Sequence, residues 1–274
     1  MRADAVMQGE GKPRVAVHKF TSCDGCQLAF LNLGESLLEL TRYVDIVHFI
    51  EAGMIAPDTP VDVAFVEGSV STPEELERIQ QVRASTKYLV TMGACATAGG
   101  LQALRNNADA ADWIAAVYAH PEAVHALDTA TPIAAHVKVD LELWGCPVNG
   151  RQVVGAVRDL LFGVAPRTEQ DSVCLECKRA GNVCVLVASA RPCMGPVTRT
   201  GCGALCPSVG RDCYACYGPA PTANTDAIAA RFTALGLLPE DVARRFLFIN
   251  NAAPTFAEAG AKAGGLASQR SPTK

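Results

Sequence analysis

The sequence has few of the features that mark a secreted, membrane-spanning or nucleic-acid-binding protein. No window of the 274 residues reaches the roughly 18 to 20 uninterrupted apolar residues that a membrane-spanning helix needs. Basic residues are not gathered in runs, and the formal net charge is -4, which argues against a nucleic-acid surface. The first dozen residues lack the apolar core of a secretory signal and a twin-arginine pair. We therefore expect a cytoplasmic protein with no direct membrane insertion and no nucleic-acid partner.

Two further absences narrow the function. No GxGxxG follows a predicted strand and no P-loop is present, so we expect the chain to bind no nucleotide itself. Cysteine is missing from residues 27–94, and 49% of the residues are apolar. A secreted disulfide scaffold is normally short and dense in cysteine throughout, so this distribution disfavours disulfides.

Twelve cysteines are the most informative feature of the chain, and eight of them fall between Cys174 and Cys216. They divide into three groups of four, and four thiolates are what one cubane 4Fe-4S cluster needs. The count therefore predicts three 4Fe-4S clusters in one polypeptide, which indicates a path for electrons.

The first part of the chain, to Gly163, alternates short β-branched runs with amphipathic stretches, a pattern typical of a parallel sheet covered by helices. Thr72 and Pro73 predict the start of a helix that runs to about Arg83. Apolar residues at helical spacing over 153–161 predict a second helix, which Gly163 ends. The predicted strands are residues 14–19, 44–49, 62–67, 87–92 and 137–143.

The composition changes after a predicted linker at residues 166–170. Between Cys174 and Pro221 the chain contains eight cysteines, six glycines and five prolines, too many breakers for long helices or strands. Metal ligation is expected to replace a hydrophobic core there. A helical stretch is predicted at residues 226–246. The expected organisation is an N-terminal extension at 1–13, a sheet domain at 14–165, a mostly irregular cluster-binding domain with a few helices at 166–264, and a flexible tail at 265–274.

Four cysteines follow predicted strands. Cys23 and Cys26 form a CxxC pair after the first strand, Cys95 follows the fourth and Cys146 follows the fifth. Ligands of open parallel α/β sheets bind beyond the carboxyl ends of the strands, so these thiols are expected to converge on one cluster. The alternative is a redox CxxC pair plus two buried cysteines that pack as small apolar side chains. That alternative leaves the placement at strand ends unexplained.

Four short motifs in this region resemble the small subunits of nickel-iron hydrogenases. In chain order they are Cys23-Asp24-Gly25-Cys26, Val66-Glu67-Gly68-Ser69, Gly93-Ala94-Cys95-Ala96-Thr97 and Gly145-Cys146-Pro147-Val148-Asn149. The resemblance implies a flavodoxin-like domain whose four cysteines hold the proximal cluster, nearest the nickel-iron centre of a large subunit. The related quinone-reductase subunits of respiratory complexes typically carry adjacent cysteines where this chain has CxxC, so the pair favours a hydrogenase.

The last eight cysteines divide by their spacing, with intervening gaps of two, six, eight, eight, three, six and two residues. The spacing allows interleaved ligands, as in paired ferredoxin clusters. It also allows one zinc ion held by the CxxC pairs 174/177 and 213/216, which would use only four of the eight thiols. Residues 193–198 resemble the hydrogenase segment at the last distal ligand and support sequential groups. The resemblance then implies a distal cluster on Cys174, Cys177, Cys184 and Cys193 and a medial cluster on Cys202, Cys206, Cys213 and Cys216.

Two departures from the respiratory hydrogenases bear on the electron partner. Cys174 stands where their distal cluster has a histidine ligand, and Cys206 supplies a fourth thiolate where their medial centre often has three irons. All-thiolate four-iron clusters are expected to have lower potentials. The pattern resembles the cytoplasmic multi-subunit hydrogenases, including the sulfhydrogenase type. It implies a subunit of a hydrogenase, an oxidoreductase acting on hydrogen, with no catalytic residue of its own.

The resemblance also implies the partners. Electrons would pass between the nickel-iron site of a large subunit and a flavin- and NAD(P)-binding diaphorase, a ferredoxin-type protein or another iron-sulfur subunit. The alternative function is an iron-sulfur subunit of a quinone-reductase-like respiratory complex without hydrogenase activity. The histidines all lie outside the cysteine segment, and each is expected to be structural or exposed rather than a ligand: His18, His48, His120, His125 and His136.

Overall fold

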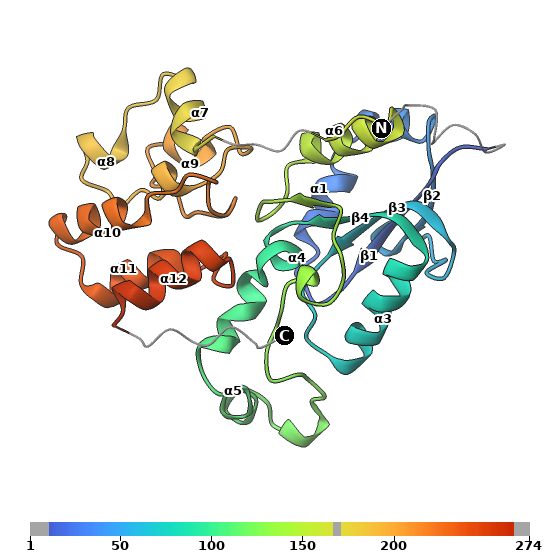
Figure 1. Cartoon of the computed structure of the whole chain (residues 1–274), viewed down its shortest axis with the longest axis horizontal. Coiled ribbons are helices and arrows are strands. Elements are labelled where there is room, and N and C mark those ends of the chain that lie inside the picture. Colours follow the sequence, from blue (N-terminus) through green and yellow to red (C-terminus); the bar gives the residue numbers. More distant parts are fainter. Residues whose placement is uncertain (1–10, 167–170, 266–274) are drawn as a thin grey trace. The chain divides into compact units, whose positions relative to one another are not determined.

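The computed structural model describes residues 11–166 and 171–265. The chain divides into two compact units, with the division between residues 168 and 169. The first unit contains one sheet, whose strands are β1 (Arg14–Lys19), β2 (Asp45–Phe49), β3 (Val61–Glu67), β4 (Thr86–Met92) and β5 (Leu141–Leu143). All are parallel, in the order β2-β1-β3-β4-β5 (Figure 1). This is the flavodoxin-like order, so the predicted fold class is confirmed.

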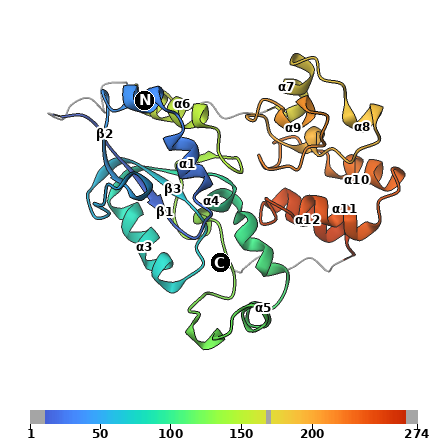
Figure 2. The same ribbon diagram turned by 180° about the vertical axis from the view of Figure 1, so that it is seen from behind.

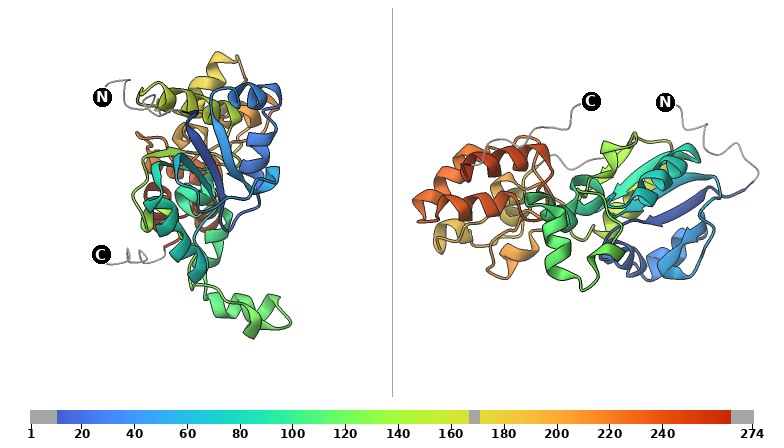
Figure 3. Two further views of the ribbon diagram at one scale, coloured as in Figure 1. Left: turned by 90° about the vertical axis from the view of Figure 1, so that its right-hand side faces the viewer. Right: turned by 90° about the horizontal axis from the view of Figure 1, so that it is seen from below.

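Helices cover both faces of this sheet. One face packs on α1 (Gly25–Leu31) and α6 (Gly150–Leu161), and the other packs on α3 (Pro73–Ala84) (Figure 3). Because neither face meets solvent, β3 is buried along almost its whole length and alternates little between apolar and polar residues. The sheet therefore holds the loops at its carboxyl ends on a rigid base.

The two predicted helices of the first unit are present, with the predicted Thr72, Pro73 and Gly163 at their ends and an unpredicted cap at Asn149. The Thr72 hydroxyl accepts from the backbone N–H of Glu75 at 3.2 Å, and Pro73 is the first residue of α3. A capping box at Asn149 begins α6, and Gly163 follows its end with a φ of 63°. The remaining helices and 3-10 turns of the unit are α2 (Glu35–Leu40), η2 (Ile50–Ala52), α4 (Ala94–Ala98), η3 (Gly100–Asn107), α5 (Ala110–Val117), η4 (Pro121–Ala123) and η5 (Ile133–Ala135).

The fifth strand is shorter than predicted, and this prediction is corrected. The expected strand 137–143 is a strand only over Leu141–Leu143. Just before it, the Asp140 carboxylate accepts from the backbone N–H of Leu89 at 2.9 Å and also pairs with Arg83. The Asp140 N–H donates to the Leu89 carbonyl at 2.9 Å, so the side chain replaces only the second bond of the pair. The β-branched residues of this segment do not reveal that replacement.

The second unit begins with short helices and ends with longer ones. Its first part contains α7 (Val173–Arg179), α8 (Val185–Ala188), η6 (Gly195–Val197) and α9 (Leu205–Ser208), which agrees with the density of breakers. The predicted helical stretch 226–246 is instead two helices, α10 (Thr225–Ala234) and α11 (Pro239–Phe246), because Gly236 has a φ of 90° and Pro239 starts a new helix.

A last helix, α12 (Pro254–Ala263), was not predicted. It packs beside α11 (Figure 2), and the Phe246 and Phe256 rings lie 5.9 Å apart between their centroids. Gly260 allows this approach, since a β-carbon there would overlap the side chain of Leu247. The second unit therefore has a small aromatic core of its own. Most of the predicted linker and tail lies outside the described residues. Among the helices of the described residues, none is both long and apolar enough to cross a membrane.

Candidate iron-sulfur sites

The first four cysteines lie where three strands of the sheet end. Cys23 precedes α1 and Cys26 lies in its first turn, directly after β1. Cys95 lies in α4 after β4, and Cys146 follows β5. Because β1, β4 and β5 are parallel, these residues share one edge of the sheet.

Backbone hydrogen bonds hold these loops together. The Ala94 N–H donates to the Gly145 carbonyl at 2.7 Å, which joins the loop after β4 to the loop after β5. The Val148 N–H donates to the Cys26 sulfur at 3.4 Å, which joins the loop after β5 to the start of α1. An N–H directed at a cysteine sulfur is typical of iron-sulfur ligation, where it stabilises the negative charge on sulfur.

Glycines beside the sulfurs leave room that a side chain would fill. A β-carbon on Gly93, whose φ is 88°, would overlap the Cys26 sulfur. A β-carbon on Gly100, whose φ is 59°, would lie 2.5 Å from the Cys95 sulfur. The backbone therefore passes against two of the four thiols, as a site for a bulky inorganic group requires.

The four thiols are close enough to affect one another electrostatically. Burial, with repulsion from Cys146 and Cys23, raises the pKa of the Cys95 thiol to about 12. Burial first, and then repulsion from the Glu67 carboxylate, raises the pKa of Cys26. Burial and repulsion from Cys23 raise the pKa of Cys146. Without iron these buried thiols are neutral, so binding iron must displace their protons.

Glu67, at the end of β3, is 2% exposed. Its two carboxylate oxygens accept from the backbone N–H groups of Cys26 at 2.9 Å and Gln27 at 3.1 Å. Burial raises the pKa of this carboxyl, and the two N–H bonds oppose that rise. The side chain therefore fixes the start of α1 and, with it, the position of Cys26.

In the second unit, the four cysteines predicted for the distal cluster lie near one another. Burial, with repulsion from Cys193, Cys177 and Cys184, raises the pKa of the Cys174 thiol to about 11. A β-carbon on Gly195 would lie 3.4 Å from the Cys193 sulfur and 3.7 Å from the Cys174 sulfur. Gly195 therefore lies beside two of these sulfurs, although a β-carbon there would make only ordinary van der Waals contact, unlike one at Gly93 or Gly100.

The four cysteines predicted for the medial cluster are held by more varied contacts. The Cys213 sulfur is buried and accepts from the Ala215 N–H at 3.4 Å. Burial first, and then repulsion from the Cys193 and Cys216 thiols, raises the pKa of Cys213. The Cys213 N–H also donates to the Cys193 sulfur at 3.3 Å. The two predicted groups therefore meet at Cys193 and Cys213.

The other two members of this group have different neighbours. The Cys202 sulfur lies 4.0 Å from a carboxylate oxygen of Glu176, a residue of α7 that also accepts from the Gly201 N–H. The carbonyl of Cys206, in α9, accepts from the Arg211 N–H at 2.9 Å. Sequence reasoning missed Glu176, because a glutamate between two cysteines of a short helix has no distinctive pattern.

All twelve cysteines have free thiols. Within the described ranges, no three His, Cys, Asp or Glu side chains are grouped closely enough to hold a single metal ion. A cubane makes a different demand, because each of its thiolates binds a different iron. The all-cysteine donor sets, the glycine backbone against sulfur and the N–H groups directed at sulfur fit such clusters.

The flavodoxin-like sheet and the cysteines at its strand ends are the features that the motifs predicted from their resemblance to nickel-iron hydrogenase small subunits. The chain belongs to the family described as NADH ubiquinone oxidoreductase, 20 Kd subunit, whose model matches residues 23–160. Subunit delta of sulfhydrogenase 2 from Pyrococcus furiosus is 36% identical, over 85% of this chain and 97% of that relative. One subunit of the vhu F420-non-reducing hydrogenase of Methanococcus voltae is 28% identical, over 76% of this chain and 82% of that relative.

A solved structure extends the likeness to three dimensions. A chain of an NAD+-reducing nickel-iron hydrogenase in the H2-reduced state matches with a TM-score of 0.53 and 29% identity, covering 58% of this chain and 96% of that chain. The predicted resemblance to nickel-iron hydrogenase small subunits is thus confirmed.

Proposed function

We propose that this chain is the electron-transfer small subunit of a nickel-iron hydrogenase. The observation that carries the proposal is the meeting of Cys23, Cys26, Cys95 and Cys146 at one edge of a parallel sheet, from loops that follow three different strands. Support comes from the sulfhydrogenase and F420-non-reducing hydrogenase relatives. Every CxxC pair of this chain belongs to one of the proposed cluster sets, so none is left to hold nickel and iron. We therefore assign the nickel-iron site to a large subunit.

The proposal includes three 4Fe-4S clusters. The proximal set is Cys23, Cys26, Cys95 and Cys146, the distal set is Cys174, Cys177, Cys184 and Cys193, and the medial set is Cys202, Cys206, Cys213 and Cys216. A bound 4Fe-4S cluster supplies one-electron redox chemistry.

The protein residues tune that chemistry. N–H groups of Val148, Cys213 and Ala215 stabilise negative charge on the cysteine sulfurs, which raises a cluster's potential. Buried carboxylates near the sulfurs, such as Glu67, act in the opposite direction. The chain therefore sets the energies at which electrons enter and leave.

The proposed partners are a nickel-iron large subunit and a flavin- and NAD(P)-binding or ferredoxin-type protein, in a cytoplasmic complex without nucleic acid or direct membrane insertion. The sulfhydrogenase relative matches 85% of the chain, whereas the NAD+-reducing structure covers 58%. This difference favours an assembly of the sulfhydrogenase type.

Removing iron is expected to affect the second unit more than the first. Residues 174–216 have only short helices, so ligation contributes much of their folding energy, whereas β1, β3 and β4 lie between apolar layers. Anaerobic chelation should speed amide hydrogen exchange in residues 174–216 by about a hundredfold or more, with much smaller changes in these strands. Equal protection before and after chelation would show that the clusters do not organise this segment.

The proposed function is tested on the native complex, purified without oxygen. Nickel in a companion large subunit and hydrogen evolution from a reduced dye are expected. A complex that contains iron and sulfide but no nickel, and evolves no hydrogen, would contradict the proposal. That result would instead support the quinone-reductase-like alternative.

A further inference from the structure

Two imidazoles lie side by side within the layer between the sheet and α3. His18 and His48 are 2% and 1% exposed, and their ring centroids are 4.7 Å apart. Among the described residues, His18 Nδ1 and His48 Nε2 are buried and have no hydrogen-bond partner. Buried polar atoms are normally paired, so this pair needs an explanation.

An irregularity in the sheet places His48 on this face. β1 pairs with β2 through Val15 and Ile46, but the next pair is Ala16 with His48, so one residue of β2 is skipped. Such a bulge turns the following side chain, and His48 here lies on the α3 face together with Ala16. The bulge therefore places the His48 imidazole on the α3 face of the sheet, whereas regular alternation along β2 would place it on the opposite face.

The hydrogen-bonding state of His48 follows from its neighbour. Its Nδ1 accepts from the backbone N–H of Ala56 at 3.2 Å. Burial, and then the nearby Arg78 charge, lower the pKa of His48, so the ring is neutral. A neutral ring that accepts at Nδ1 carries its hydrogen on Nε2. His48 therefore offers a buried N–H donor that the fold does not use.

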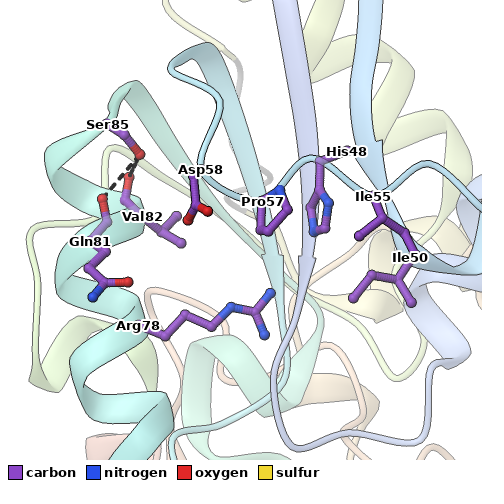
Figure 4. A pocket seen from close by; sticks show the side chains of 9 residues that line it. All are labelled: His48, Ile50, Ile55, Pro57, Asp58, Arg78, Gln81, Val82 and Ser85. Atoms are coloured by element: carbon purple, nitrogen blue, oxygen red, sulfur yellow. Dashed lines mark hydrogen bonds between the residues drawn. The ribbon is translucent and has the colours of Figure 1, made fainter.

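His48 lines a cavity of about 560 Å³, a volume in the range of small-molecule sites. Arg78 reaches into this cavity from α3, with its guanidinium directed toward His48 and Pro57 (Figure 4). One guanidinium nitrogen donates to the Lys19 carbonyl at 3.0 Å, and the group lies over the Phe20 ring at 5.1 Å. These contacts hold the positive charge in place.

We propose that this cavity binds a small organic anion, a carboxylate or a phosphate monoester, through Arg78 and, after a small turn of the covered imidazole toward the ligand, the Nε2–H of His48. The apolar part of the ligand would lie against Ile50 and Ile55, two large side chains that are 37% and 76% exposed beside the cavity. Asp58 also lines the cavity, but its side chain is exposed, so solvent screens the repulsion between its carboxylate and a bound anion. The site shares no residue with the cysteine sets and does not depend on the clusters.

The test is calorimetric titration of the full, cluster-loaded chain at constant ionic strength, with benzoate and phenyl phosphate as probes. One site is expected for at least one probe, and the preferred probe identifies the anion class. Arg78→Gln should weaken binding about tenfold or more, because it removes a charge-assisted contact. His48→Phe keeps a ring of similar size but removes the donor, and should also weaken binding. Asp58→Asn should strengthen it.

The matched control is Arg42→Gln, which removes the same charge from an exposed position that does not line the cavity. Affinity in this variant should stay within about twofold of the parent. Absence of saturation by either probe up to about 10 mM would overturn the proposal. Equal weakening in the Arg42 and Arg78 variants would overturn it as well. If Arg78→Gln does not fold, an unchanged affinity for the probes in both His48→Phe and Asp58→Asn would overturn the proposal.

Discussion

Replacing Gly93 with alanine is expected to abolish the proximal cluster while the other two clusters remain. Gly93 has φ 88° and ψ 167°, a conformation that is essentially restricted to glycine. A β-carbon there would also overlap the Cys26 sulfur, which sits against rigid backbone rather than at the end of a flexible chain. Cys26 cannot move away without breaking its bond from Val148 and the bonds from the start of α1 to Glu67.

The expected readout for Gly93→Ala is a fall from about twelve to about eight irons per chain, with loss of electron transfer from the large subunit. Gly155→Ala is the matched control. Gly155 lies in α6, and a β-carbon there meets nothing within 4 Å. Alanine also favours helix, so this variant should keep all its iron and be slightly more stable. Full iron content and normal EPR signals in Gly93→Ala would show that the proximal cluster is not at this edge.

Replacing Cys206 with serine is expected to damage the medial cluster and spare the proximal one. Serine is a poor ligand for the iron of such a cluster, so the site would lose either one iron or all four. Iron content should fall to about eleven or about eight per chain. Low-temperature EPR of the reduced protein should show one altered centre, with the proximal signal unchanged.

Val209→Ser is the control for this variant, since Val209 is 68% exposed three residues further on and has no thiol. It should leave the EPR spectrum unchanged. If Cys206→Ser alters two centres together, the ligands of the second unit are interleaved. If it alters none, Cys206 is not a ligand.

Much of the first unit could be predicted from sequence because two physical regularities apply there. Buried parallel strands are short β-branched runs, and four of the five strands begin and end within one residue of the predicted positions. The carboxyl ends of such strands share one edge of the sheet, so the sequence alone predicts that Cys23, Cys95 and Cys146 lie together. The prediction of the fifth strand failed because the Leu89 N–H donates to the Asp140 side chain instead of a backbone carbonyl, which the sequence does not reveal.

The second unit was less predictable because contacts distant in sequence determine it. The break between α10 and α11 had local signals in Gly236 and Pro239, which the apolar periodicity of the region obscured. The approach of Cys213 to Cys193 depends on the path of the intervening loop, and spacing does not encode it. His18 and His48 were expected to be structural or exposed, and only the register shift and the cavity reveal the unused donor of His48.

Iron and acid-labile sulfide analysis of the anaerobically purified chain tests the central claim most directly. Three cubane clusters predict about twelve irons and about twelve sulfides per chain. One or two zinc ions per chain, with little sulfide, would contradict the account and favour a zinc-stabilised module.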